Sequence, residues 1–195
     1  MARPSGRPVW REWPDALVEW IGGAGVVPEN AIIVGHGSSA APASRLAADI
    51  GARGVVVLDG PLPSSGMHAT LFEPWFTGFL QGLPSSGGFL PPVTQWFDFD
   101  VMGEVPMPED TRRQFLADLP RISLSCLQDT FELPEIDRLN RYYVRTSQVY
   151  EDDAALAQAA GWNVLWVEGT HLDPMFRPVE MAGVIAGIHR DLGRM

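Results

Sequence analysis

Short, unbroken apolar runs alternate along this chain with stretches in which apolar residues recur at helical spacing. The runs Ala31–Val34 and Gly54–Leu58 are rich in β-branched residues, which predicts two buried strands. An alanine-rich stretch between them reaches Ile50 and predicts a helix that Gly51 ends. A strand, a helix and a second strand make a βαβ unit, so we expect a parallel sheet covered by helices on both faces.

The same two patterns continue to the end of the chain. They predict helices over 14–21, 154–160 and 178–192 and strands over 141–146 and 163–167. Pro14 suits the first turn of its helix, where its missing N–H costs nothing. The segment 122–127 is ambiguous between strand and helix. We therefore predict an α/β fold, in which a mostly parallel sheet is flanked by helices.

Residues 61–120 interrupt this regular order. Proline, glycine and aromatic residues are dense there, which predicts a cap or lid inserted into a single domain that spans 1–195. Helices are expected within the cap over 69–80 and 108–119. The aromatic rings either line an apolar ligand cavity or only pack the cap against the core. Residues 1–8 show no periodicity and predict a flexible arm.

The composition excludes several classes of function. All 14 basic residues are arginine, so the chain has no lysine for a Schiff base, for pyridoxal phosphate or for a Walker-type phosphate loop. The net charge of −10 argues against nucleic acid and anionic membranes as partners. The single Cys126 has apolar neighbours and predicts a buried thiol, and it excludes an internal disulfide.

These features also set our expectations for cofactors and location. We expect no cofactor and no metal, because one cysteine cannot build a multi-cysteine zinc site. No apolar run approaches the roughly 20 residues of a membrane helix, and the start of the chain has no signal-like apolar region. We therefore expect a cytoplasmic protein.

The turn after the first strand carries the first candidate chemistry. It reads Gly35-His36-Gly37-Ser38 and joins a strand to a helix. This stretch resembles the nucleophile elbow of the α/β-hydrolase family, which has the pattern G-x-S-x-G. Gly35 and His36 match that pattern, and the nucleophile position then falls on Gly37. A shift by one residue places Ser38 there instead, but His36 then occupies a position that the strained turn favours as glycine.

The C-terminal part of the chain extends this resemblance. The strand over 163–167 leads into Glu168-Gly169-Thr170-His171, and Arg177-Pro178-Val179-Glu180 opens the last helix. In the α/β-hydrolase family the last strand delivers the triad histidine shortly before a P-x-E helix start. The resemblance implies that His171 is a general acid or base facing a cavity under the cap.

The resemblance leaves the acid partner of His171 open. Val149 falls where the family often keeps an aspartate, and Glu151 and Asp152 lie close enough to replace it. Asp59, at the end of the second strand, is the other candidate. The acidic residues that follow Tyr150 are also typical of a solvated helix N-terminus, where negative charge is stabilised by about 0.3–1 kcal/mol.

The chain resembles an α/β hydrolase that is reduced at its N-terminus. No early strand that could carry the family's second oxyanion donor precedes Pro14, so only the amide of Ser38 remains, and losing one such donor costs about 10²–10³ in rate. Without those early strands, the strand over 31–34 forms an exposed sheet edge. An apolar edge promotes association, so we predict a homodimer formed through it.

Three functions remain open. In the first, the chain is a cyclase, lyase or isomerase that acts on a small apolar carbonyl metabolite, with His171 as general acid/base and no covalent serine intermediate. In the second, it is a serine esterase in which Ser38 attacks and Glu151, Asp152 or Asp59 orients His171. In the third, it binds a ligand without turnover. The residues that we expect to contact the ligand are Gly37, His36, Trp75, Phe76, Trp96, Phe97 and Tyr150.

Overall fold

The computed structural model of the protein describes residues 9–100 and 107–193. Contacts within the chain divide it into two compact units. The first, which we call the sheet unit, contains Val9–Ala69 and the chain from Thr130 onward. The second, which we call the aromatic unit, contains Thr70–Asp129. The flexible arm predicted over 1–8 lies outside the described residues.

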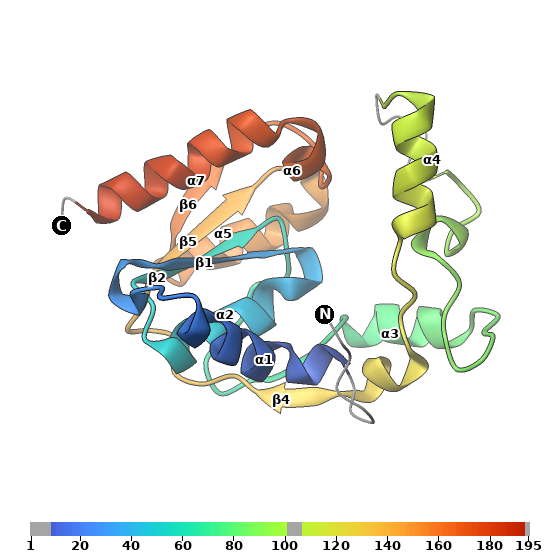
Figure 1. Ribbon diagram of the computed structural model, residues 1–195, viewed down its shortest axis with the longest axis horizontal. Helices are drawn as coiled ribbons and strands as arrows, with labels where there is room; N and C mark the ends of the chain where they lie inside the picture. Colours follow the sequence, from blue (N-terminus) through green and yellow to red (C-terminus); the bar gives the residue numbers. More distant parts are fainter. Residues whose placement is uncertain (1–8, 101–106, 194–195) are drawn as a thin grey trace. The chain divides into compact units, whose positions relative to one another are not determined.

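A parallel sheet of four strands forms the centre of the sheet unit (Figure 1). Its strands are β1 (Ile32–His36), β2 (Gly54–Leu58), β5 (Asn140–Arg145) and β6 (Asn163–Trp166), in the order β1-β2-β5-β6. All three pairings are parallel. The prediction of a mostly parallel α/β sheet is therefore confirmed. Among the described residues, β1 and β6 form the two edges of this sheet.

The helices of the sheet unit are α1 (Val9–Gly23), α2 (Ala40–Ile50), α5 (Glu151–Ala159), the short α6 (Asp173–Phe176) and α7 (Pro178–Leu192). Figure 1 shows α7 on one face of the sheet and α2 on the other. The alternation of side chains along each strand explains this division, because successive residues point to opposite faces. The sheet is consequently apolar on both faces, as its unbroken apolar strands predict.

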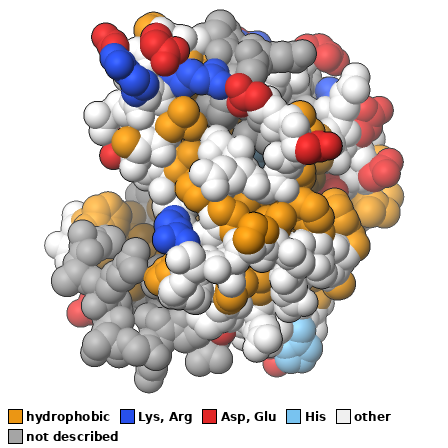
Figure 2. All heavy atoms as spheres, turned by 90° about the vertical axis from the view of Figure 1, so that its right-hand side faces the viewer, with side chains coloured by type: hydrophobic (Ala, Val, Ile, Leu, Met, Phe, Trp, Pro, Cys, Tyr) orange, Lys and Arg blue, Asp and Glu red, His pale blue; other side chains and the backbone are white. Residues whose placement is uncertain are grey.

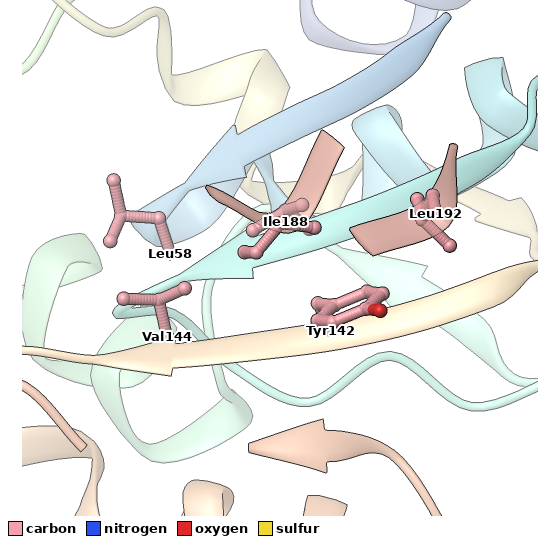
Figure 3. Close-up of a cluster of buried hydrophobic side chains, with 6 residues drawn as sticks. Leu58, Tyr142, Val144, Ile188 and Leu192 are labelled. Atoms are coloured by element: carbon pink, nitrogen blue, oxygen red, sulfur yellow. The ribbon is translucent and has the colours of Figure 1, made fainter. Parts of the chain in front are cut away.

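A cluster of buried hydrophobic side chains lies on the α7 face of the sheet. Leu58, Tyr142 and Val144 of the strands pack with Ile188 and Leu192 of α7 (Figure 3). Each fully buried aliphatic side chain in such a cluster contributes about 1.5–3 kcal/mol relative to its exposed state. This packing holds the last helix against the strands, and it therefore also holds the loop that precedes that helix.

On the other face of the sheet, α2 approaches β1 closely at Gly35. A Cβ atom on Gly35 would lie 2.7 Å from both the Ala43 Cβ and the Ser39 carbonyl oxygen, so only glycine fits where β1 passes under α2. Gly51, with φ of 67°, ends α2 in the left-handed conformation. Gly35 thus lets α2 pack directly against β1, and Gly51 lets the chain turn from α2 toward β2.

Among its described residues, the aromatic unit contains α3 (Pro74–Gln81), α4 (Glu109–Asp118) and two short 3₁₀ turns. Leu80, Leu90, Trp96 and Leu127 are buried together in it. Other large apolar side chains of this unit are exposed, and the most accessible are Trp75, Phe79 and Phe99. Hydrophobic side chains reach the surface over broad areas of the face drawn in Figure 2.

Several predicted boundaries were wrong. The first helix begins at Val9, so Pro14 lies inside it and not in its first turn. The segment predicted as one helix over 69–80 begins with strand β3 (His68–Thr70), which pairs with β4 (Thr130–Glu132), and α3 starts only at Pro74. A strand of three residues is too short to show a period of two, which is why the sequence did not reveal it.

Two further features of the structure concern the single cysteine and the length of the helices. Cys126 is a buried free thiol, as its neighbours predicted. None of the helices within the described residues is both long enough and apolar enough to cross a membrane.

Candidate active site

The candidate site lies at the carboxyl ends of the parallel strands. Four segments meet there: the turn at Gly37 after β1, Asp59 after β2, Thr146-Ser147 after β5, and the loop after β6 that carries His171. In open α/β sheets, ligands bind at this end of the strands, because the loops there converge.

His171 and Asp59 form the central pair of the site. Nδ1 of His171 lies 2.9 Å from Oδ2 of Asp59. The Asp59 side chain is fully buried, whereas that of His171 is 39% exposed. A buried carboxylate next to a partly exposed imidazole fixes one ring nitrogen and leaves Nε2 free to exchange a proton with a ligand.

The buried carboxylate of Asp59 is fully hydrogen-bonded. Oδ1 accepts the backbone N–H groups of Thr146 and Ser147, each at 2.8 Å, and Oδ2 accepts the Ser147 hydroxyl at 2.6 Å. Burial by itself raises the pKa of Asp59, but hydrogen bonds from His171, Ser147 and Thr146 more than offset it, so the pKa is lowered. Asp59 is therefore ionised near neutral pH and can stabilise a protonated His171.

The backbone at Asp59 is unusual. Its φ of 46° lies in the left-handed region, where aspartate is found more often than most residues. Its N–H donates to the Val144 carbonyl at 2.8 Å and so continues the β2–β5 ladder by one residue. The following Gly60 has no room for a side chain, because a Cβ there would collide with the Gly37 carbonyl oxygen. The strained turn thus brings the end of β2 directly against the turn after β1.

His36 holds the loop that carries His171. Its Nε2–H donates to the His171 carbonyl oxygen at 2.8 Å, and the two rings stack with centroids 4.4 Å apart. Burial lowers the pKa of His36, and the nearby charge of His171 lowers it further. His36 therefore stays neutral and acts as a donor to a backbone carbonyl, not as a second exposed base.

Gly37 is the residue that faces the imidazole. It has φ of 56°, and a Cβ at this position would lie 3.1 Å from Cε1 and 3.2 Å from Nε2 of His171. Within the part of the chain that the structure describes, no hydrogen bond joins Ser38 to His171. The turn therefore directs residue 37, which has no side chain, toward the free nitrogen of His171.

The acidic residues after β5 are not brought to His171. Glu151 accepts a hydrogen bond from Arg145 at 2.8 Å, and its side chain is 58% exposed. Asp152 is exposed in the first turn of α5, and Val149 is also exposed. Asp59 is the carboxylate that the geometry pairs with His171. The sequence left these candidates open because only the sheet order decides which carboxylate meets the histidine.

The remaining predicted ligand contacts fall into two groups. The Tyr150 ring centroid lies 5.6 Å from that of His171, so these two rings are neighbours. The other four, Trp75, Phe76, Trp96 and Phe97, belong to the aromatic unit, where Trp96 is buried and Trp75 is 75% exposed. Their role in binding a ligand stays a prediction.

No signal in the sequence marks Thr146 and Ser147 as parts of the site. Both residues follow β5 and hold Asp59, yet a polar pair after a strand is common and has no period. As for metals, the described residues contain no group of three or more histidine, cysteine or acidic side chains arranged to hold an ion.

A parallel sheet flanked by helices, with a histidine–aspartate pair beside a strand–turn–helix, defines the α/β-hydrolase class. The chain belongs to this family, since a sequence model of the alpha/beta hydrolase family matches residues 3–184. A comparison with curated protein sequences found no significant match.

Solved structures share the fold at low sequence identity. An extracellular α/β-hydrolase from a Paenibacillus species, described as sharing structural and functional homology with tobacco salicylic acid binding protein 2, superimposes with a TM-score of 0.73 at 12% identity, over 95% of this chain and 82% of that one. Tomato methylketone synthase I complexed with 2-tridecanone gives 0.71 at 14% identity, over 95% and 80% of the two chains. A variant of that enzyme complexed with beta-ketoheptanoate gives 0.70 at 13% identity, over 94% and 78%.

Proposed function

We propose that this chain catalyses a non-hydrolytic reaction at the carbonyl group of a small apolar metabolite, with His171 as general acid/base. The observation that carries the proposal is the pairing of a buried, ionised Asp59 with His171, whose free Nε2 faces the bare backbone of Gly37. A positioned acid or base of this kind contributes about 10²–10⁴-fold.

The geometry at Gly37 favours chemistry without a covalent intermediate. An acyl-transfer mechanism needs a nucleophilic side chain within hydrogen-bond reach of its base. The position that points at Nε2 of His171 belongs to a glycine, which carries no hydroxyl or thiol. Residue 37 therefore presents only its backbone to the imidazole, and the group that exchanges a proton with Nε2 would belong to the substrate itself.

Decarboxylation of a β-keto acid is the reaction of this class that we propose first. The ligands in the tomato methylketone synthase I structures, beta-ketoheptanoate and 2-tridecanone, are a β-keto acid and a methyl ketone. Loss of carbon dioxide from a β-keto acid yields a methyl ketone, so the two ligands belong to the substrate class and the product class of one type of reaction, with different chain lengths. The identity of 13–14% carries the fold alone, and the likeness in function is part of the proposal.

The step needs one proton and no cofactor. The bond between the α-carbon and the carboxylate carbon breaks, and carbon dioxide leaves. The electron pair of the broken bond forms the carbon–carbon double bond of the enol. Protonated His171 gives its Nε2 proton to the ketone oxygen as charge develops there. The enol then takes a proton at the α-carbon and loses the oxygen-bound proton, so one substrate anion and one proton give one methyl ketone and carbon dioxide.

The surrounding charges suit this step. Ionised Asp59 stabilises the protonated imidazole from the buried side. The N-terminal end of α2, which follows the Gly37 turn, favours a negative charge nearby by about 0.3–1 kcal/mol. A substrate carboxylate beside Gly37 would thus lie between a helix N-terminus and an imidazolium.

The proposal is tested with β-ketoheptanoate and the full chain. We expect release of carbon dioxide and 2-hexanone above the spontaneous rate, and a loss of about 10²–10⁴-fold in His171→Ala. The exposed His68 provides the matched control, and His68→Ala should retain the rate. Ser38→Ala should also retain it.

Two results would reject this function. A stable adduct on Ser38 with a fluorophosphonate probe, together with hydrolysis of an activated ester, would favour the serine esterase. Binding of β-ketoheptanoate without any conversion would favour a ligand-binding protein.

A further inference from the structure

The buried carboxylate of Asp59 comes from one strand, but the groups that hold it come from the next. Asp59 follows β2, whereas Thr146 and Ser147 follow β5, the parallel neighbour of β2 in the sheet. Three of the four hydrogen bonds that Asp59 accepts come from these two residues, and the fourth comes from His171. An ionised carboxylate has about four lone-pair sites, so the set is complete.

We propose that Ser147 is a positioning residue, whose hydroxyl sets the orientation of the Asp59 carboxylate and, through it, of the His171 ring. This proposal rests on the proposed function, because it is through proton transfer by His171 that the orientation affects turnover. The observation behind it is that one oxygen, Oδ2 of Asp59, accepts both the Ser147 hydroxyl at 2.6 Å and Nδ1 of His171 at 2.9 Å.

The hydroxyl has a task that the backbone amides do not perform. The N–H groups of Thr146 and Ser147 both donate to Oδ1, the oxygen that does not contact His171. The Ser147 hydroxyl donates to Oδ2 and so holds the other oxygen directly. Since Oδ2 is the atom that meets Nδ1 of His171, a donor that keeps Oδ2 in place also keeps the direction in which the imidazole points.

Burial makes this contact strong. Asp59 is fully buried and Ser147 is 7% exposed, so water does not compete for Oδ2 from their side. A hydrogen bond from a neutral donor to a charged acceptor in such surroundings is about twice as strong as one between neutral groups. Removing the hydroxyl would leave a buried charge short of one donor, which is costly.

The charged and titratable groups around Asp59 are few and come from three elements. His171 contacts Asp59 from the loop after β6. The charge of Asp59 also makes a small contribution that raises the pKa of His36 on β1. On β5, the pKa of Tyr143 is raised mainly by burial, with smaller contributions from Asp153 and Asp59, and its hydroxyl donates to the Gly60 carbonyl oxygen at 2.5 Å. Ser147 supplies hydrogen bonds that lower the pKa of Asp59 against its burial.

The test follows the titration of the Asp59 carboxyl carbon by NMR, with Asp59→Asn used to assign the signal. In Ser147→Ala we expect this titration to move to higher pH, because the charged form loses a donor. With β-ketoheptanoate as substrate, kcat should fall about tenfold while KM stays unchanged. Ser147→Thr keeps the hydroxyl and should restore both readouts.

The matched control is Ser44→Ala. Ser44 is also a buried serine with one hydrogen bond, to the Ala40 carbonyl oxygen, and it lies on α2 away from Asp59. This variant should leave the Asp59 titration where it is in the wild type. Ser147→Cys has a similar volume and a weaker donor, so it provides the same comparison if Ser147→Ala does not fold.

The outcomes separate the two proposals. An Asp59 titration that is the same in wild type and in the Ser147 variants would overturn the role of Ser147. A shifted titration without conversion of β-ketoheptanoate by the wild type would support the placement of Asp59 by Ser147 and would overturn the proposed function instead.

Discussion

His171 and Asp59 are 112 positions apart in the chain, yet Nδ1 of one lies 2.9 Å from Oδ2 of the other. Asp59 leaves the sheet at the end of β2, and His171 follows β6, with β5 between these two strands. The loop after β6 therefore crosses the end of β5 to reach the carboxylate. Thr146 and Ser147 lie at that crossing, which is why the same two residues hold the acid.

Replacement of Asp59 should change the response of the protein to acid. Because the pKa of Asp59 is lowered from 3.8, its ionised form stabilises the folded state above that pH, and this stabilisation is lost as the pH falls through the lower folded value. The difference in free energy of unfolding between wild type and Asp59→Asn should thus be largest near neutral pH and shrink toward pH 2. Urea unfolding at several pH values measures it. A difference that is constant across that range would contradict the assignment.

A serine at position 37 should convert the site toward nucleophilic chemistry. Gly37→Ser places a hydroxyl next to Nε2 of His171, since a Cβ there lies 3.2 Å from that nitrogen. We expect the variant to be labelled by a fluorophosphonate probe, as read by intact mass, and to lose turnover of β-ketoheptanoate. The positive φ should lower stability by about 1–3 kcal/mol.

Gly37→Ala is the control for that variant. It carries the same backbone strain without a hydroxyl, so it should be destabilised to a similar degree and remain unlabelled. A folded Gly37→Ser protein that does not react with the probe would show that residue 37 does not face a competent base.

Loss of the His36 hydrogen bond should loosen the loop that carries His171. His36→Phe keeps an aromatic ring for stacking but leaves the His171 carbonyl oxygen without its donor. We expect a loss of about 1–3 kcal/mol in the free energy of unfolding and faster amide exchange over 169–173. His189→Phe is the comparison, because His189 makes an exposed hydrogen bond to the Asn30 carbonyl oxygen and should cost less than about 0.5 kcal/mol. Equal effects of the two changes would refute the anchoring role.

The edge of β1 leads to a prediction about association. Val34, in the middle of this edge strand, is 40% exposed, and the strand carries no charge that would discourage pairing. We propose that two copies pair through β1, so sedimentation should give about twice the chain mass of 21.4 kDa. Val34→Lys should yield monomers, whereas Val179→Lys, at an 86% exposed position of α7, should not. A wild-type protein that sediments as a monomer at high micromolar concentration would exclude this dimer.

The four strands of the parallel sheet and most helices could be predicted because their signals are local. The boundaries of β2 and of the final helix agree with the apolar pattern, since Gly54, Gly51 and Pro178 mark where the chain must turn. The first helix was predicted from Pro14 onward, and the preceding turn, which begins at Val9, carries no clear period. Periodicity thus located each strand of the parallel sheet, with the ends of β1, β5 and β6 displaced by one or two residues, and it placed the start of the first helix too late.

The acid partner shows where local signals stop. Glu151, Asp152 and Asp59 are equally good carboxylates when only the order of residues is considered. The choice depends on β2 lying beside β5 and on a positive φ at Asp59, and both follow from long-range packing. The hydroxyl of Ser147 was missed for the same reason, because its partner is 88 positions away in the chain.

Local signals predicted the parallel α/β sheet and the strand–turn–helix at Gly37, because these depend on residues that are neighbours in the chain, where sterics and periodicity act directly. The resemblance to the α/β-hydrolase family, and no local pattern, singled out His171. Three relationships became visible only when the chain was folded: Asp59 contacts His171, Ser147 contacts Asp59, and a glycine faces the imidazole. These relationships join separate strands, and their geometry is set by how the strands pair and how α7 and α2 pack on the two faces of the sheet.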